Sequence, residues 1–434
     1  MSQQDTDKPA ANTDQADSDA PELASVFEDH MVVLNALPYH ATREALAKNT
    51  FEKHDETPWP TAILNNRGTL GHAQLRPLAA DQHGMLPPEA LDKLTRSMWL
   101  QREELNDLDA DVLDALSAFW IKQTTNPNGD ALAKVDDFLR LRGLKPKKGG
   151  RGEGGYRPEQ RMDILRALFH IQNLWLNVSE IEAFDQERSS PVRKSIQSRA
   201  FIITDRMGQL ELDGTMDVDQ FIFRPGKVFA HYLFGPGRQT ALLAAQALRY
   251  DYKKQAREKR LVRYLSWQWR IQARTRSYQR TYRVSTLLDT IGEDTAPKRP
   301  GRIRERLEKA LDTLEGDFLI SAWHYERWDE NKADKRGWFK LWLDATILIE
   351  PPENIKAHYE SITEAQRQSL EPSDDLPLGQ RMLNHRTAKG ESQTNVARQL
   401  GISQTYLSKL ERGKSNPDRI SFKLKQGIDK WLQS

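Results

Sequence analysis

The stretch from Ser392 to Gly413 constrains this chain more than any other, because its caps and glycines predict two short helices and the turn between them. Ser392 can cap a first helix, and Ser403 can cap a second. Between them, Gly401 supplies the positive φ that ends one helix and redirects the chain. The small side chain of Ala397 lets the two helices cross closely. A compact helical hairpin is therefore expected here.

The second helix of this hairpin should present a polar face. Ile402, Leu407 and Leu410 are expected to point into the core. The outward residues are then Gln404, Thr405, Ser408, Lys409 and Arg412. Such a helix fits the major groove of DNA, where glutamine pairs with adenine and lysine with guanine. A helical hairpin that makes no DNA contact is the alternative.

Residues Ser392 to Pro417 resemble the phage-repressor (Cro/C1) family of helix-turn-helix domains. The resemblance implies that Gln404, Thr405 and Lys409 read bases, while Gln393 contacts phosphate from the start of the preceding helix. It also implies that Glu411 is a structural acid. Beyond the recognition helix, Arg412 and Lys414 are expected to contact phosphates.

The bulk composition limits the class of protein. A chain of 434 residues is too long for one ordinary core and predicts two to four domains. The net charge is only +2 although 29% of residues are charged, so any basic surface must be local. The absence of cysteine excludes disulfides, thiolate zinc sites and cysteine nucleophiles. No apolar stretch could span a bilayer, and the polar, acidic start is unlike a secretory signal, so we expect a cytoplasmic protein without membrane contact.

The expected fold is mostly α with small β-hairpins, as two winged-helix domains followed by an all-α helix-turn-helix domain. Composition and periodicity divide the chain at prolines, glycines and charged turns. The expected parts are a disordered acidic leader at 1–24, an irregular N-terminal extension at 25–85, a first winged-helix-like domain at 86–235, a second at 236–350, a helix and linker at 351–377, and the helix-turn-helix domain at 378–434.

In the first winged-helix-like domain, helices are expected around 88–99, 108–119 and 131–142, followed by a flexible basic loop at 145–155. A strong helix is predicted from Pro158 to Asn177. Its outer face should carry Arg157, Arg161, Arg166 and His170, of which Arg157 and Arg161 are DNA-contact candidates. Short β segments should follow at 200–204, 209–212 and 220–223, with a turn at 205–208.

The second winged-helix-like domain is expected to repeat this order. Helices are predicted at 238–250, 258–274 and 284–290, the last ended by Gly292. The clearest amphipathic helix runs from Arg302 to Leu314, with Arg302, Arg306 and Lys309 on its outer face as DNA-contact candidates. Strands are expected at 318–326 and 338–349.

The run from Lys253 to Arg283 is strongly basic, and Glu258 is its only acidic residue. Tyrosines and tryptophans are interleaved with the cations. Cations at this density neutralise DNA phosphates, which makes Arg274, Arg276 and Arg280 candidate contacts. The alternative is a solvated helix face with a buried aromatic stripe.

The segment Tyr282 to Gly292, followed by Arg302 to Leu311, resembles the second winged helix of theta-type plasmid replication initiators. These bacterial proteins use tandem winged helices to bind direct repeats at an origin. The appended repressor-type domain departs from the simplest members, which leaves open which domain reads the origin and which an operator.

We therefore expect a sequence-specific DNA-binding protein without catalytic activity, cofactor or metal. Its partners would be double-stranded DNA, host replication proteins such as a helicase, and further copies of the chain. The alternative is a transcriptional regulator whose N-terminal region senses a ligand or oligomerises. Gly413-Lys414-Ser415 lacks the upstream glycine of a nucleotide-binding loop, and His324 and Arg327 fall on an expected strand, unlike the helical catalytic residues of tyrosine recombinases.

Overall fold

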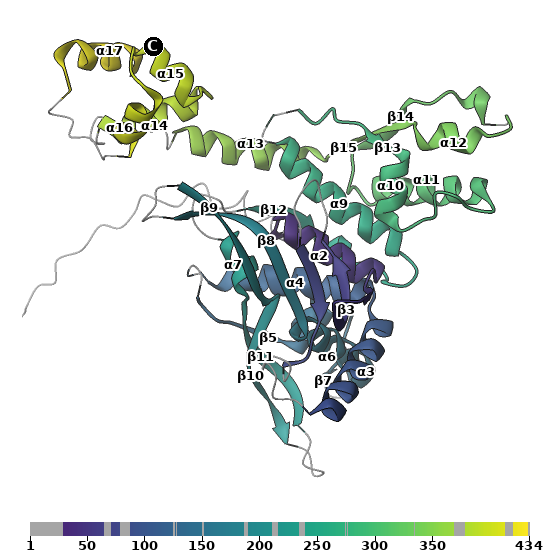
Figure 1. Ribbon diagram of the computed structural model, residues 1–434. Helices are drawn as coiled ribbons and strands as arrows, with labels where there is room; N and C mark the ends of the chain where they lie inside the picture. Colours follow the sequence, from purple (N-terminus) through teal and green to yellow (C-terminus); the bar gives the residue numbers. More distant parts are fainter. Residues whose placement is uncertain are drawn as a thin grey trace, which may run out of the picture. The chain divides into compact units, whose positions relative to one another are not determined.

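The computed structural model (Figure 1) describes residues 29–64, 71–78, 87–124, 126, 128–149, 152–185, 190–210, 216–233, 239–273, 275, 277–333, 335–368, 378–412 and 420–432. The chain folds into two compact units, residues 1–352 and residues 353–434. Helices predominate, the sheets are small and antiparallel, and the second unit is helical throughout its described residues. The predicted leader at 1–24 lies outside the described residues.

The first half of the N-terminal unit alternates helices with short strands. Its elements are β1 (His30–Leu34), α2 (Leu37–Lys48), β2 (Glu52–His54), β3 (Thr57–Ile63), β4 (Gly71–Leu75), α3 (Pro88–Glu104), α4 (Asp107–Gln123), β5 (Ala131–Lys134), α5 (Val135–Leu141), β6 (Lys147–Gly149), β7 (Gly152–Gly154), α6 (Pro158–Gln172), β8 (Leu174–Asp185), β9 (Ser190–Arg199), β10 (Phe201–Leu210), β11 (Met216–Pro225) and α7 (Lys227–His231).

The second half of this unit is more helical. Its elements are β12 (Thr240–Ala244), α8 (Gln246–Arg249), α9 (Ala256–Gln272), β13 (Tyr282–Arg283), α10 (Val284–Ile291), α11 (Pro300–Gly316), β14 (Ala322–Arg327), the 3-10 helix η2 (Glu330–Lys332), α12 (Trp338–Leu343) and β15 (Thr346–Glu350). As predicted, Gly292 ends α10 in the left-handed conformation, with φ 77°.

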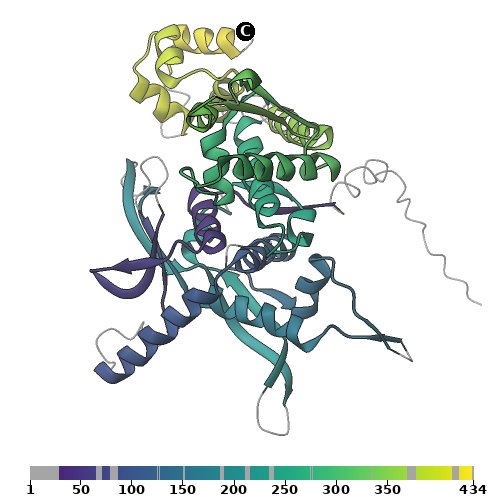
Figure 2. The same ribbon diagram turned by 90° about the vertical axis from the view of Figure 1, so that its right-hand side faces the viewer.

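One succession of elements occurs twice in the N-terminal unit. In the first half, α4, β5, α5 and α6 occur in this order, with β6 and β7 before α6. After the intervening strands β8 and β9, which belong to another sheet, the hairpin of β10 and β11 joins β5 in a sheet of order β10-β11-β5. In the second half, α9, β13, α10 and α11 are followed by β14 and β15, with η2 and α12 between these two strands, in a sheet of order β13-β15-β14. In both sheets the last strand lies between the other two. Figure 2 shows the β10–β11 and β6–β7 hairpins reaching away from the helices.

The prediction of an irregular extension at 25–85 was wrong. This stretch contains α2 and four strands, and β1 pairs with β12 while β4 pairs with β8. The partners lie about a hundred residues or more further along the chain, so no local pattern could indicate them. Pro58 and Pro60 are tolerated in β3 because β4 pairs with that strand only from Thr61 to Ile63, and because the ladder with β2 is irregular between Thr57 and Thr61.

Several predicted bounds and types were also wrong because pairing overrode local preference. The stretch 240–244 is strand β12 and not a helix, since it completes a ladder with β1. Helix α6 stops at Gln172, and Leu174 and Trp175 begin β8. The stretch 338–343 is helix α12, and only β15 is extended. The basic loop at 145–155 contains the β6–β7 hairpin.

The predicted turn at 205–208 is instead part of the continuous strand β10. Its ladder with β11 shifts register between Ile203 and Asp205 and again between Met207 and Gly208. The polar residues that suggested a turn therefore produce bulges, which bend a strand without ending it.

The C-terminal unit comprises α13 (Glu353–Gln368), α14 (Leu378–Ala388), α15 (Gln393–Gln399), α16 (Gln404–Glu411) and α17 (Phe422–Leu432). A core of nine buried residues joins α14 to α17: Met382, Val396, Ala397, Leu407, Leu410, Ile420, Ile428, Trp431 and Leu432. Every core residue predicted for the hairpin of α15 and α16 is in or packed against this cluster.

Candidate nucleic-acid interface

The hairpin of α15 and α16 has the predicted caps and turn. The Ser392 hydroxyl accepts a hydrogen bond from the backbone N–H of Asn395 at 3.2 Å, and the Ser403 hydroxyl accepts one from Tyr406 N–H at 3.2 Å. Gly401 has φ 67°, a backbone conformation that residues with a Cβ rarely adopt. Serine caps satisfy backbone donors that the first helical turn leaves unpaired.

Helix α16 exposes the predicted polar face. Gln404, Thr405, Lys409 and Arg412 are exposed and Ser408 is half-buried, while Leu407 and Leu410 on the opposite side are buried. Gln393, at the first turn of α15, is half-buried beside this face. Its side-chain Oε1 lies 3.5 Å from Nε2 of Gln404. The two glutamines thus lie next to each other where a base-reading and a phosphate-contacting residue were predicted. Lys414 lies outside the described residues.

A buried carboxylate links three helices of this unit, α14, α15 and α16. Glu411 is 4% exposed and accepts hydrogen bonds from Arg386 of α14, with Nε to Oε1 at 2.6 Å and Nη2 to Oε2 at 3.2 Å. Gln393 of α15 donates to the same carboxylate at 2.7 Å. A buried carboxylate requires such partners, because an unpaired charge loses its hydration without compensation. The structural role of Glu411 was predicted, whereas Arg386 was missed.

Helix α14 lies very close to the recognition helix. A Cβ added to Gly379 would lie 2.0 Å from the carbonyl oxygen of Leu410. No side chain fits in that space, so glycine is required for the contact between α14 and α16.

Helix α11 presents the second candidate surface. Arg302, Arg306 and Lys309 are all exposed, while Ile303, Leu307 and Leu311 on its other side are buried. Arg306 forms an ion pair with Glu293 at 3.2 Å. The structure therefore keeps the predicted cations on one outer face, two of them without an ion pair among the described residues.

Helix α6 differs from the predicted basic face. Arg157 is exposed, but Arg161 is half-buried in an ion pair with Asp136 at 2.9 Å. His170 is only 3% exposed, and its Nδ1 lies 2.6 Å from Oδ1 of Asp109 in α4. Placing His170 on the outer face was wrong, because a buried acid on another helix supplies its partner.

Some cations of the Lys253–Arg283 run are buried in ion pairs, and others are exposed on the surface. Arg263 is 3% exposed and pairs with Asp107 at 3.2 Å, with Asp114 at 2.8 Å and with Asp111. Arg260 pairs with Asp107 at 2.8 Å. We call this contact between α4 and α9 the α4–α9 seam; its residues are Asp107, Asp111, Asp114, Lys259, Arg260 and Arg263.

Lys259 is the most buried cation of the seam. It has no exposed surface, and its Nζ donates to the carbonyl oxygens of Ala247 at 2.7 Å and Tyr250 at 2.8 Å and pairs with Asp111 at 3.0 Å. Burial lowers the pKa of Lys259 to about 8, partly offset by the neighbouring carboxylate of Asp111. These cations were predicted to face solvent or DNA; the acidic residues that pair with them lie on α4, outside the run.

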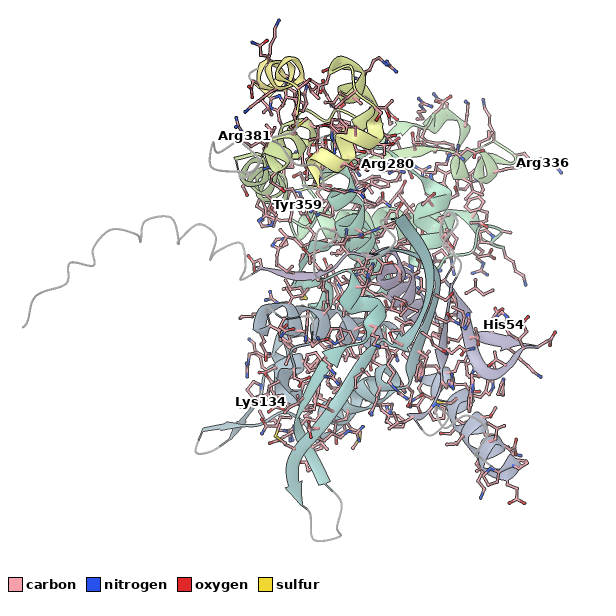
Figure 3. All side chains as sticks on the ribbon, turned by 60° about the vertical axis from the view of Figure 1, so that its left-hand side comes forward. His54, Lys134, Arg280, Arg336, Tyr359 and Arg381 are labelled. Carbon is pink, nitrogen blue, oxygen red and sulfur yellow. The ribbon has the colours of Figure 1, made fainter. Side chains whose placement is uncertain are left out.

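The remaining cations of this run are less constrained. Arg280 is exposed, and among the described residues it has no ion pair. It lies near the end of the segment between α9 and β13, and its side chain is labelled in Figure 3. Arg274 and Arg276 lie outside the described residues. Of the three candidate DNA contacts in the run, the structure describes only Arg280, which lies on the surface.

No described helix is both long enough and apolar enough to cross a membrane. Among the described residues, no group of three or more His, Asp or Glu side chains is arranged to hold a metal ion.

Comparison with known proteins gives one match in sequence and two in structure. Residues 384–422 match the family model described as helix-turn-helix. No curated protein sequence matches the chain. A crystal structure of domains 2 and 3 of RctB, a SeMet derivative, is 13% identical with a TM-score of 0.35, covering 63% of this chain and 85% of that one. A second, of RctB residues 155–483, is 11% identical with a TM-score of 0.36, covering 71% and 97%.

Similarity at these TM-scores shows neither the fold nor the function of this chain. The match to the helix-turn-helix family model lies in the C-terminal unit. There the match spans the end of α14, all of α15 and α16 and the start of α17. It includes both serine caps, Gly401 and the exposed polar face of α16. The C-terminal unit of this chain carries a DNA-binding helix-turn-helix of the Cro/C1 type.

Proposed function

We propose that this protein is a replication initiator of the plasmid type, which binds repeated sites at an origin through two winged helices and the C-terminal helix-turn-helix. The protein binds double-stranded DNA and catalyses no covalent reaction. Host replication proteins such as a helicase, and further copies of the chain, would join it at the origin.

The repeated topology of the N-terminal unit carries this proposal. A winged helix places a strand after its first helix, two more helices, and then a hairpin whose last strand lies in the centre of the sheet. Both α4–β11 and α9–β15 contain these elements in this order, with β6 to β9 inserted in the first region and with η2 and α12 inserted between the last two strands of the second. Together with α16, the chain would hold three modules for reading DNA, which suits a series of sites better than a single one.

The two proposed winged helices are not equivalent. On α11, the third helix of the second, the outer face carries Arg302, Arg306 and Lys309. On α6, the corresponding helix of the first, Arg161 is neutralised by Asp136, and Met162 and Phe169 are 55% and 49% exposed. Cations bind DNA phosphates, whereas exposed apolar side chains do not. We therefore assign the stronger DNA contact to α11, with Arg157 and Arg161 of α6 as a weaker one.

The test is the architecture of the binding site. Footprinting of the purified chain on genomic or plasmid DNA should show several short direct repeats protected together. A plasmid that carries those repeats should then replicate only in cells that express the chain. Protection of repeats without replication would contradict the initiator role while leaving DNA binding intact.

A transcriptional regulator is the second candidate. The observation in its favour is a large cleft in the N-terminal unit that could hold a ligand. A single palindrome within a promoter, in place of repeats, would support this candidate. Cleavage of a DNA strand, in the repeats or in the palindrome, would contradict both candidate functions, because cleavage requires a catalytic centre.

A further inference from the structure

A cleft of about 1100 Å³ lies in the N-terminal unit, between α2 on one side and α9, β13 and α10 on the other. Ligand pockets for small molecules are commonly of about this size or smaller. Among the described residues of the N-terminal unit, Arg280 is the one candidate DNA contact that lines the cleft, and no residue of α11 lines it. The cleft is therefore distinct from the cationic outer face of α11.

One wall of the cleft is aromatic. Tyr264 and Trp267 of α9 are half-buried, and their ring centroids lie 6.0 Å apart. His40 of α2 stacks on Trp267 at 4.2 Å with an angle of 14° between the rings. Burial, and then the nearby cations Arg43 and Lys48, lower the pKa of His40 well below its ordinary value, so the ring is neutral at pH 7. This wall offers an uncharged π surface, on which flat aromatic ligands stack.

A buried amide beside this wall lacks a partner. Gln268 is 5% exposed and lines the cleft next to Trp267, and its Oε1 has no hydrogen-bond partner among the described residues. A buried acceptor left unpaired is costly, and such groups in proteins usually meet a donor. This oxygen is enclosed, so an exocyclic amine of a bound base would supply that donor once the amide turns toward the cleft. The amide of glutamine combines an acceptor and a donor, and this pair matches the edge of adenine.

Part of the cleft lining is cationic. Arg280 and Arg283 are exposed on its rim, and neither has an ion pair among the described residues. Lys48 also lines the cleft but is paired with Glu44 and Asp289. Arginine side chains bind phosphate through two parallel hydrogen bonds, which gives both strength and orientation. The rim therefore suits an anionic group attached to a ligand that lies deeper.

From this arrangement we propose that the cleft binds a nucleotide. Its base lies against Tyr264 and Trp267 with an edge on Gln268, and its phosphate reaches Arg280 and Arg283. The inference goes beyond the proposed DNA binding and does not depend on it. A free nucleotide and an unpaired base in a nucleic-acid strand offer the same chemistry, and the experiment below distinguishes them.

The test uses the full chain and calorimetric titration with AMP, ADP and ATP, with a short single-stranded oligodeoxyadenylate, and with adenosine and inorganic phosphate as partial ligands. We expect a nucleotide to bind and each partial ligand to bind at least about tenfold more weakly, because stacking and phosphate contacts each contribute. Binding of AMP, ADP or ATP identifies a free nucleotide as the ligand. Binding of the oligonucleotide alone identifies an unpaired strand.

Three variants locate the binding. Arg280→Ala should weaken it about tenfold or more, and Gln268→Ala should do the same. Thr286→Trp, at an exposed position on α10 that lines the cleft, should abolish it by filling the space. The matched control is Lys254→Ala, an exposed cation of the same basic run that does not line the cleft.

Two results would overturn the proposal. One is no heat of binding for any nucleotide or oligonucleotide at millimolar concentration. The other is binding that survives Thr286→Trp, or that falls equally in Lys254→Ala and Arg280→Ala, which would indicate general charge attraction. Because footprinting of duplex DNA by the Thr286→Trp chain reports on the helix-turn-helix separately, failure here and failure of the proposed DNA-binding function are distinguishable.

Discussion

At the scale of single residues, the recognition helix gives the sharpest expectation. Gln404→Ala and Lys409→Ala should each weaken binding to the cognate site by about 1–3 kcal/mol, the usual value of one base-reading contact. Fluorescence anisotropy with cognate and unrelated duplexes measures this, and binding to the unrelated duplex should barely change. Lys425→Ala, at an exposed lysine of α17, is the control. Equal losses on both duplexes would show that α16 contacts only the backbone.

The carboxylate of Glu411 gives a second expectation at this scale. Glu411→Gln removes the charge that Arg386 pairs with, and breaking a buried pair costs about 3–5 kcal/mol. That is a large part of the stability of a small domain. Hydrogen exchange of the full chain should show loss of protection in α14 to α16 alone, whereas the control Asp429→Asn on α17 should leave protection unchanged. Protection that persists in Glu411→Gln would mean that hydrophobic packing suffices.

At the scale of elements, the packing of α4 against α9 predicts a pH dependence. Because the pKa of Lys259 falls from 10.5 to about 8 on folding, between these values the unfolded chain holds a proton that the folded chain has released. Stability therefore rises with pH across this window. Relative to Lys259→Met, the wild-type free energy of unfolding should increase by about 2–3 kcal/mol from pH 8 to pH 10.5.

Urea denaturation of both proteins at several pH values measures this difference, and tyrosine titrations cancel because the two proteins share them. Lys259→Arg, which keeps its proton, should lack the rise as well. An exposed control, Lys254→Met, should behave as wild type. A wild-type curve parallel to that of Lys259→Met would mean that Lys259 keeps an ordinary pKa.

The basic faces of α9 and α11 should respond differently to substitution. Arg302→Ala and Lys309→Ala on α11 should each lower the slope of log affinity against log salt by about 1, since each removes one phosphate contact. Arg263→Ala on α9 should instead destabilise the N-terminal unit, because it leaves Asp107, Asp111 and Asp114 short of a partner. Circular dichroism separates the two effects. An unchanged slope in both α11 variants would show that α11 does not contact DNA phosphates.

At the scale of the whole molecule, the two units should be separable. A fragment of residues 353–434 holds its own core and should fold alone. It should bind DNA more weakly than the full chain, because linked modules raise one another's effective concentration. Residues 1–352 should still bind DNA at low salt, as gel shift can establish. If that fragment folds without any DNA affinity, the initiator proposal fails and the regulator becomes the better account.

Local sequence determined the helix-turn-helix almost completely. Its caps at Ser392 and Ser403, the turn at Gly401 and the exposed residues of α16 all depend on neighbours within a few positions, so their pattern is readable from the chain alone. The same holds for α10 and α11, where apolar periodicity and Gly292 mark the buried face and the end.

Only the tertiary structure decided the rest, because it depends on partners distant in sequence. Strands β1 and β12 pair across about two hundred residues, so neither strand has its partner nearby in the sequence. The partners of Arg263 lie on α4, about 150 residues earlier. A charge pattern shows how many cations a segment holds, but only the fold shows which of them meet a carboxylate and which remain for DNA or a ligand.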